Sequence, residues 1–371
     1  MSLLCRLSLV YVQKTMINNT KHYISAEASL EPRRRLEKCS LCESEQGFVV
    51  SKVDFWDLQT SELVQCQDCL HIQLDPKLTP AATSEGCLAY YIRESYGISQ
   101  REQGRNRLRN FRRGVLFGRS LIHLNIQPKQ VLECGPGDGF FLQGLKFVFP
   151  NIEITVLDIV EEVLKACREV HGYRTILGSP DSPELKSETL FDLIVARDVI
   201  EHVNDLQTMT DNLKRLLTPK GYFHFITPNG YEDVWGHFVL WKTQKKKSEL
   251  LINHVNYFEG HSLESYLQGQ GFRQLSYYTY RFKDALKGKG RKFADRWLTP
   301  ARGTKTSEFL TRPPAKHHSL ASVEEIYKVS YVSKKYPWLT YFVSAYHHFN
   351  WLRLSPKHNR GHEIFGLFQK N

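Results

Sequence analysis

The chain has 371 residues, of which 41% are hydrophobic and 12% aromatic, and its formal net charge at pH 7 is +11. This length allows one large α/β domain with one or two small modules, and the hydrophobic content excludes a wholly disordered chain. No apolar run reaches the roughly 18 residues that cross a bilayer. The apolar stretch Leu3–Val12 is short and contains Arg6. We therefore expect a cytoplasmic protein without a transmembrane segment.

Composition and motif spacing divide the chain into six predicted segments. They are an irregular N-terminal extension (1–37), a zinc ribbon (38–75), a helical connector that caps the substrate (76–128), an α/β core (129–280), a basic and aromatic helical insertion (281–360), and the final strand of the core (361–371). The insertion holds 17 Lys/Arg against 5 Asp/Glu. The positive charge therefore belongs to one late segment and is not a property of the whole fold.

Two pairs of cysteines in the second segment have the spacing of metal ligands. Cys39 and Cys42 form one C-x2-C pair, and Cys66 and Cys69 form another after 23 intervening residues. Two such pairs supply four thiolates, which complete a tetrahedral zinc site with no open position for catalysis. The spacing predicts a structural Zn²⁺. The alternatives are unrelated thiols or two redox pairs.

From Gln130 onward, strand-like and helix-like segments alternate, which predicts a parallel sheet covered by helices. The expected strands are Val131–Cys134, Ile152–Leu157, Arg174–Leu177, Phe191–Ala196, Tyr222–Thr227, Phe272–Tyr280 and Glu363–Phe368. The expected helices are Phe140–Val148, Val160–His171, Leu206–Leu217 and Ser262–Gly269.

A glycine-rich turn follows the first of these strands. Glu133 precedes Gly135, Gly137 and Gly139, and residues without a Cβ allow the backbone to turn sharply and approach a ligand. Dinucleotide enzymes have a similar turn, but here the third glycine follows after one residue. This shorter turn favours a nucleoside without a pyrophosphate, and Glu133 is placed to orient its ammonium group.

Further candidate cofactor contacts follow the next three strands. Asp158, followed by Ile159, lies 19 residues beyond Gly139, where a carboxylate can accept both ribose hydroxyls; the alternative is a helix N-cap. Ser179 would flank the adenine, and Arg197 with Asp198 would line the other end of the ligand.

These motifs together resemble a known enzyme family. The order VLECGPGDG, VLD, FDLIVARDVIEHV, LKRLLTPKGY and TPN, over residues 130–280, is similar to class I S-adenosylmethionine-dependent methyltransferases related to ubiquinone-pathway O-methyltransferases. The segment LVQCQDCLHIQLDP resembles the zinc-binding domain that precedes bacterial methyltransferases of saccharide gene clusters. The resemblance implies a Rossmann-like fold, S-adenosylmethionine as cofactor, and cofactor contacts from Gly135, Gly137, Asp158 and Asp198. Ser179 departs from the acid more usual beside adenine.

The candidate catalytic residue lies in a segment that matches an H-x-x-x-F motif of these relatives. His254 would act as general base, because an imidazole titrates near neutrality. The alternative is a histidine that only holds its loop. His202, in the sequence Glu201-His202-Val203, is the rival. In the relatives this Glu–His pair lies beneath the cofactor, so the resemblance implies that both residues are mainly structural.

We therefore predict a methyltransferase for a small or carrier-linked acceptor, with a saccharide or nucleotide sugar favoured. The alternatives are an RNA methyltransferase that grips phosphate with the ribbon and the insertion, and a cofactor-binding scaffold without catalysis. The insertion predicts a solvated helical lid or peripheral contact with an anionic membrane surface, and nucleic acid is the less favoured partner.

Overall fold

The computed structural model describes residues 34–55, 59–96, 100–230, 250–252, 254–280 and 363–371. The predicted insertion at 281–360 and nearly all of the predicted N-terminal extension lie outside these residues.

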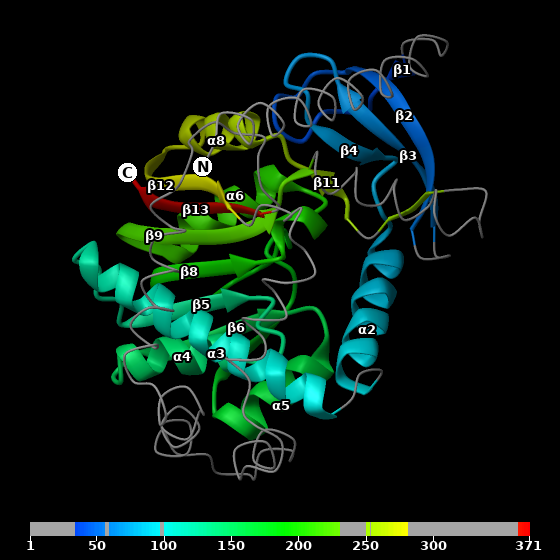
Figure 1. The fold of residues 1–371 in the computed structure, drawn as a ribbon. Coiled ribbons are helices and arrows are strands. Elements are labelled where there is room, and N and C mark those ends of the chain that lie inside the picture. Colours follow the sequence, from blue (N-terminus) through cyan, green and yellow to red (C-terminus); the bar gives the residue numbers. More distant parts are fainter. Residues whose placement is uncertain (1–33, 56–58, 97–99, 231–249, 253, 281–362) are drawn as a thin grey trace, which may run out of the picture.

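A seven-stranded mixed sheet forms the centre of the molecule (Figure 1). Its order is β12-β13-β9-β8-β5-β6-β7. The strands are β5 (Gln130–Cys134), β6 (Glu153–Asp158), β7 (Arg174–Leu177), β8 (Phe191–Arg197), β9 (Leu217–Pro228), β12 (Phe272–Tyr280) and β13 (Glu363–Lys370). Strands β5 to β9 pair in parallel, while β13 runs antiparallel between β9 and β12. The predicted Rossmann-like α/β sheet is confirmed.

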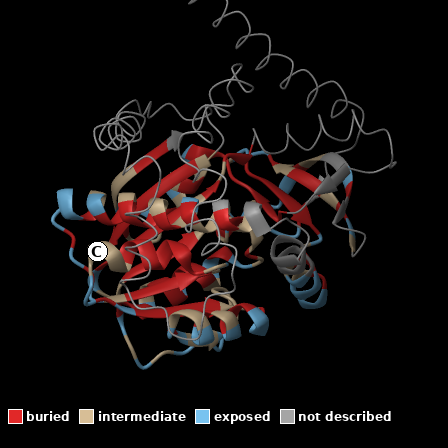
Figure 2. Ribbon diagram, turned by 60° about the horizontal axis from the view of Figure 1, so that its bottom comes forward, coloured by how far each residue is buried: buried red, intermediate tan, exposed pale blue. Residues whose placement is uncertain are grey.

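The interior strands are apolar on both faces, as expected where helices cover both sides of a parallel sheet. Val131 and Leu132 of β5 and Leu193 and Ile194 of β8 are at most 1% exposed. Figure 2 shows the buried strands in red and exposed residues in pale blue at the periphery. The covering helices are α3 (Gln100–His123), α4 (Phe140–Val148), α5 (Glu161–His171), α6 (Leu206–Leu216) and α8 (Gly260–Gly269).

Helix α3, which was expected in the connector, packs closely on α4 of the core. The two helices cross at Gly114 and Gly144. A Cβ on Gly114 would lie 1.9 Å from the Phe141 carbonyl oxygen, and one on Gly144 would lie 1.9 Å from that of Phe111. Only glycine allows this approach, so α3 is an integral layer of the core.

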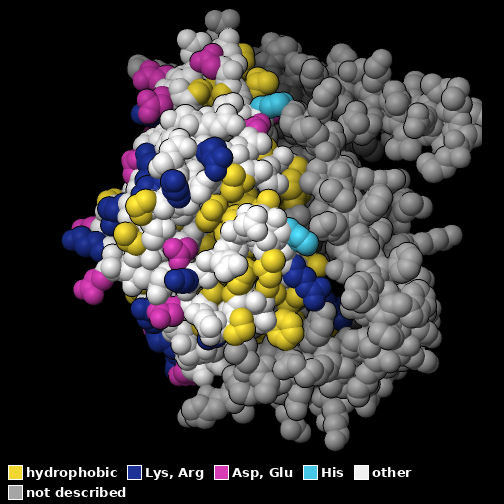
Figure 3. All heavy atoms as spheres, turned by 90° about the vertical axis from the view of Figure 1, so that its left-hand side faces the viewer, with side chains coloured by type: hydrophobic (Ala, Val, Ile, Leu, Met, Phe, Trp, Pro, Cys, Tyr) yellow, Lys and Arg dark blue, Asp and Glu magenta, His cyan; other side chains and the backbone are white. Residues whose placement is uncertain are grey.

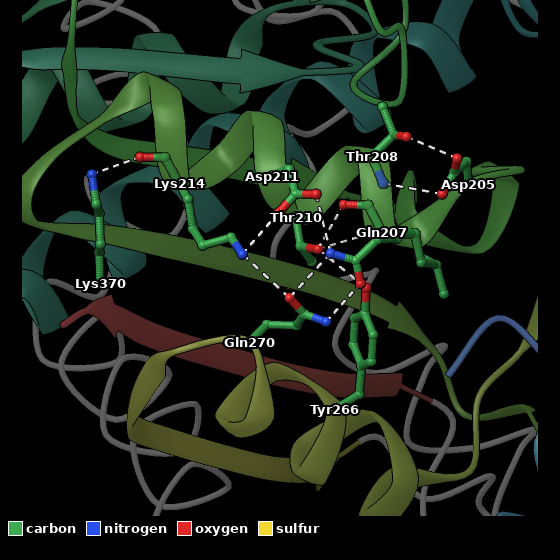
Figure 4. Close-up of polar contacts among 10 residues, drawn as sticks. Asp205, Gln207, Thr208, Thr210, Asp211, Lys214, Tyr266, Gln270 and Lys370 are labelled. Carbon is green, nitrogen blue, oxygen red and sulfur yellow. Dashed lines mark hydrogen bonds and ion pairs between the residues drawn. The ribbon is translucent and has the colours of Figure 1, made fainter. Parts of the chain in front are cut away.

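Polar contacts fix α6 to the neighbouring α8 and β13 (Figure 4). The Asp205 carboxylate caps α6 by accepting from the Thr208 N–H at 3.0 Å. The Thr210 and Tyr266 hydroxyls lie 3.1 Å apart, and Lys370 donates to the Lys214 carbonyl at 2.6 Å. These contacts hold the last strand of the chain against a helix that lies far earlier in the sequence.

A second sheet contains the paired cysteines and lies at the upper right of Figure 1. Its strands are β1 (Arg34–Arg35), β2 (Gln46–Phe55), β3 (Gln59–Cys66), β4 (Ile72–Asp75), β10 (Leu250–Ile252) and β11 (Asn256–Tyr257). β11 pairs antiparallel with β4, and β10 pairs parallel with β2. Four strands within residues 34–75 therefore form this sheet together with two strands from the region after β9.

Figure 3 shows the face on the left-hand side of Figure 1, where Lys/Arg and Asp/Glu side chains are interspersed over the described surface. Among the described residues, no helix has the length and hydropathy of a membrane-crossing segment.

Candidate functional site

The candidate site lies at the carboxyl ends of β5, β6 and β8, the edge at which open α/β sheets bind ligands. Helix α2 (Pro80–Tyr96) and the residues before it approach this edge. Lys77 donates to the Asn204 carbonyl, and the Asn204 amide donates to the Leu78 carbonyl at 3.3 Å. Burial and the nearby charge of Asp158 raise the pKa of the Cys87 thiol in α2 to about 11. The N-terminal part of the chain is thus attached to the loops that bear the predicted site residues.

The glycines of the turn after β5 have distinct surroundings, although all three have positive φ angles, of 63°, 54° and 70° for Gly135, Gly137 and Gly139. A Cβ on Gly135 would lie 2.6 Å from Val199, and one on Gly139 would lie 2.7 Å from His171. A Cβ on Gly137 would have no protein atom within 4 Å. Gly135 and Gly139 therefore satisfy internal packing, and Gly137 faces open space suited to a ligand.

Glu133 is a fully buried carboxylate beneath this turn. Its Oε1 accepts from Arg197 Nε at 2.9 Å, while Oε2 has no hydrogen-bond partner among the described residues. The Arg197 guanidinium also lies 3.8 Å from the centre of the Phe141 ring. Burial raises the pKa of Glu133 to about 7, although Arg197 acts in the opposite direction. A buried carboxylate oxygen without a partner fits a cationic ligand group.

Asp158 ends β6 and is half-buried, as is Ile159. Its Oδ1 accepts from the Val160 N–H at 2.9 Å, but the N-cap residue of α5 is Val160 itself and no side chain caps that helix. Asp158 therefore does not act as the N-cap that the sequence left open. Burial raises its pKa to about 6, opposed by the backbone N–H groups of Val160 and Ile159.

Ser179 lies in the loop after β7, but its side chain is already engaged. Its hydroxyl donates to the Asp181 carboxylate, and its N–H donates to the Ser182 hydroxyl at 3.0 Å. Asp181 also accepts from the Asn204 N–H at 2.9 Å. The contact of Ser179 with adenine stays a prediction. Asp181, an acid two residues further on that organises this loop, was not among the residues predicted from the sequence.

Asp198 follows β8 in the left-handed backbone region, with φ of 55°. Such a conformation is uncommon outside glycine and clusters at functional sites. Its N–H donates to the Ile226 carbonyl at 2.8 Å. Surrounding protein atoms raise the pKa of Asp198, and Glu363 adds to this effect.

The predicted base lies close to the loop that follows Asp198. His254 is 8% exposed, and its ring centre lies 4.9 Å from that of His202 in an edge-on arrangement. A carboxylate oxygen of Glu201 and one ring nitrogen each of His202 and His254 all lie within 4.8 Å of one another. The structure therefore brings together the predicted base, its rival, and a buried acid that was expected to be structural.

The paired cysteines converge at the end of β3 and in the neighbouring turns of the second sheet. All four sulfur atoms lie within 4.8 Å of one another, with 3.5 Å between Cys39 and Cys69 and between Cys42 and Cys66. A tetrahedral zinc with Zn–S bonds of about 2.3 Å separates its sulfur ligands by about 3.8 Å. The residue after each pair, Glu43 or Leu70, has a positive φ, of 65° and 62°. Two matching turns thus present four thiols to one point, which fits one metal ion.

Comparisons with known proteins agree with this arrangement. Residues 103–277 match the family model of a methyltransferase domain. The malonyl-[acyl-carrier protein] O-methyltransferase of Legionella pneumophila is 32% identical over 115 residues, which cover 30% of this chain and 40% of that protein. Its counterpart from Methylococcus capsulatus is 28% identical over 167 residues, which cover 43% and 58%. The chain therefore spans about half the length of the curated relatives it matches.

Among solved structures, the N-methyltransferase NodS of Bradyrhizobium japonicum in complex with S-adenosyl-L-homocysteine aligns with a TM-score of 0.34 and 19% identity, covering 47% of this chain and 80% of that one. The family match spans α3, the glycine turn, Asp158, Asp198 and His254. Residues 103–277 of this chain are therefore similar to the methyltransferase domains of that family.

Proposed function

We propose that the protein transfers a methyl group from S-adenosylmethionine to a small or carrier-linked acceptor. The observation that carries the proposal is the combination of an open Gly137 turn, a buried Glu133 oxygen without a partner among the described residues, and Asp158 at the end of the next strand. This set fits a cationic nucleoside. When bound, the cofactor supplies a methyl group on a positively charged sulfur.

The surroundings of the individual residues support the roles that we propose for them. Gly137 allows the ligand to approach the backbone closely, Asp158 accepts from ribose hydroxyls, and Glu133 receives the ammonium while Arg197 fixes its other oxygen. Asp198 lines the methionine end of the site, and His254 removes a proton from the acceptor. The four cysteines hold a structural zinc that stabilises the second sheet.

The acceptor class is proposed from two directions. The relatives carry names that specify an acyl-carrier-linked acceptor, and the resemblance of the cysteine segment favours a saccharide or nucleotide sugar.

Purified protein with methyl-tritiated S-adenosylmethionine should label a small or carrier-linked acceptor from a panel of malonyl-carrier thioesters, nucleotide sugars and total RNA. Gly137→Val serves as the inactive control. Label confined to RNA would contradict the proposal, as would no transfer to any member by protein that binds the cofactor, which would indicate a scaffold.

We expect affinity for S-adenosylmethionine to fall as the pH falls from 8 to 5. Two carboxyl groups titrate in this range, because burial raises the pKa of Glu133 to about 7 and that of Asp158 to about 6. Each loses its negative charge below its pKa, and a cationic ligand then binds less tightly, by up to about tenfold per group and pH unit. Calorimetric titrations at several pH values measure the slope.

The double variant Glu133→Gln, Asp158→Asn should bind weakly with little dependence on pH. Asp211→Asn, at an exposed position on α6, is the matched control and should retain the slope of the unaltered protein. An unchanged slope in the double variant would show that neither carboxylate faces the ligand.

A further inference from the structure

His254 is the predicted base, and the groups around it determine how it can hold a proton. The acid that faces it is Glu201, which lies in the short helix η1 (Ile200–His202). Glu201 is only 1% exposed. Glu201 Oε2 accepts from the hydroxyl of buried Thr227 at 2.9 Å. Glu201 Oε1 has no hydrogen-bond partner among the described residues, and the carboxylate lies within 4.8 Å of a ring nitrogen of His254. A buried carboxylate oxygen without a hydrogen-bond partner, placed beside an imidazole, can interact with the protonated form of that imidazole.

The backbone also fixes these two residues relative to each other. The Val255 N–H donates to the Glu201 carbonyl at 2.9 Å, directly after His254. Asn256 donates to the Val203 carbonyl at 2.6 Å, and its Oδ1 lies 3.2 Å from Nε2 of His71, the residue directly before β4. The segment that follows His254 is therefore held between the η1 region and the second sheet, which fixes the backbone next to His254.

We infer that Glu201 is the positioning residue of His254, orienting its imidazole and compensating its positive charge when it accepts the proton of an acceptor hydroxyl. This inference rests on the proposed function and narrows the acceptor to one with an O–H group. The acceptor oxygen gains the methyl group, the carbon–sulfur bond breaks with its electrons left on sulfur, and the acceptor proton moves to His254. A carboxylate acceptor has no proton to remove and would not need this pair.

The charges around the pair set its titration. Burial raises the pKa of Glu201 to about 8, His254 acts in the opposite direction, and Asp198 adds to the rise. Asp198 in turn faces Glu363, Arg197, Arg113 and His254. Glu201 and His254 therefore influence each other's protonation, and their titration midpoints belong to the pair.

The test is a histidine NMR titration of the full chain, which needs no acceptor and no catalysis. The His254 signal is assigned by its loss in His254→Gln. In Glu201→Gln the His254 midpoint should fall, with about a tenfold loss of proton affinity, because a neutral amide no longer stabilises the imidazolium. Glu201→Asp should recover part of that loss. Glu264→Gln, which alters the exposed His261–Glu264 pair, is the matched control and should leave His254 unchanged.

Thr227→Val gives a second arm that keeps Glu201. Loss of the hydroxyl donor makes the carboxylate more basic, so the midpoint of the pair should rise. Binding of S-adenosyl-L-homocysteine, measured by calorimetry on each variant, reports the cofactor site separately and should be preserved. An unchanged His254 midpoint in folded Glu201→Gln would overturn the inference. If that variant does not fold, an unchanged midpoint in Thr227→Val would overturn it instead. Either result would leave the methyltransferase proposal intact.

Discussion

Replacement of Gly137 by valine should abolish binding of S-adenosylmethionine and leave the protein folded. A Cβ at this position meets no protein atom within 4 Å, so the new side chain displaces only what binds there. The positive φ of 54° adds about 1–2 kcal/mol of backbone strain, which a domain of this size tolerates. Calorimetric titration measures the affinity, which should fall by more than about a hundredfold, and circular dichroism monitors the fold.

Gly271→Val is the matched control for this prediction. Gly271 also has a positive φ, of 85°, and a Cβ added to it would have no protein atom within 4 Å, but it lies between α8 and β12. The variant should therefore bear similar strain and retain full affinity. Equal affinity in both variants would place the nucleoside away from the glycine turn.

Substitution of Cys39 by serine should reduce the zinc content from one ion per chain to nearly none. A structural zinc contributes on the order of 10 kcal/mol to the folding of small modules, so its loss should loosen β2, β3 and β4. Because β11 pairs with β4 and the Leu74 N–H donates to the Val255 carbonyl, the loosening should reach the residues that follow His254. Metal analysis and hydrogen exchange over residues 255–258 measure the two effects.

Affinity for the cofactor should change less than about threefold in Cys39→Ser, since the glycine turn and Asp158 belong to the other sheet. Cys87→Ser alters a thiol outside the cluster and should retain one zinc. A full complement of zinc in Cys39→Ser, or none in freshly prepared, reduced protein of the natural sequence, would contradict the metal assignment.

Elements with strong local signals could be predicted from the sequence. Helix α4 spans Phe140–Val148 as expected, because a strand and three glycines define its start. Helix α6 ends at Leu216, just before the breaker residues Pro219 and Gly221. The strand β9, in contrast, begins at Leu217 and continues through these residues, which local pattern alone did not indicate.

Features that depend on distant parts of the chain could not be predicted. The strand β11 has only two residues and no periodicity, and its partner β4 lies some 180 residues earlier. Gly139 was expected to contact the cofactor, yet its lack of a side chain makes room for His171, which lies 32 residues later. Glu201 was expected to be structural, and only the fold shows its orphaned oxygen beside His254.

The central claim is that the carboxyl ends of β5, β6 and β8 hold S-adenosylmethionine as methyl donor. A crystal structure of the full chain with S-adenosyl-L-homocysteine tests it most directly. We expect the nucleoside over Gly137, its ribose hydroxyls on Asp158, and its ammonium beside Glu133. A ligand bound elsewhere, with Glu133 and Asp158 facing only protein or solvent, would contradict the claim.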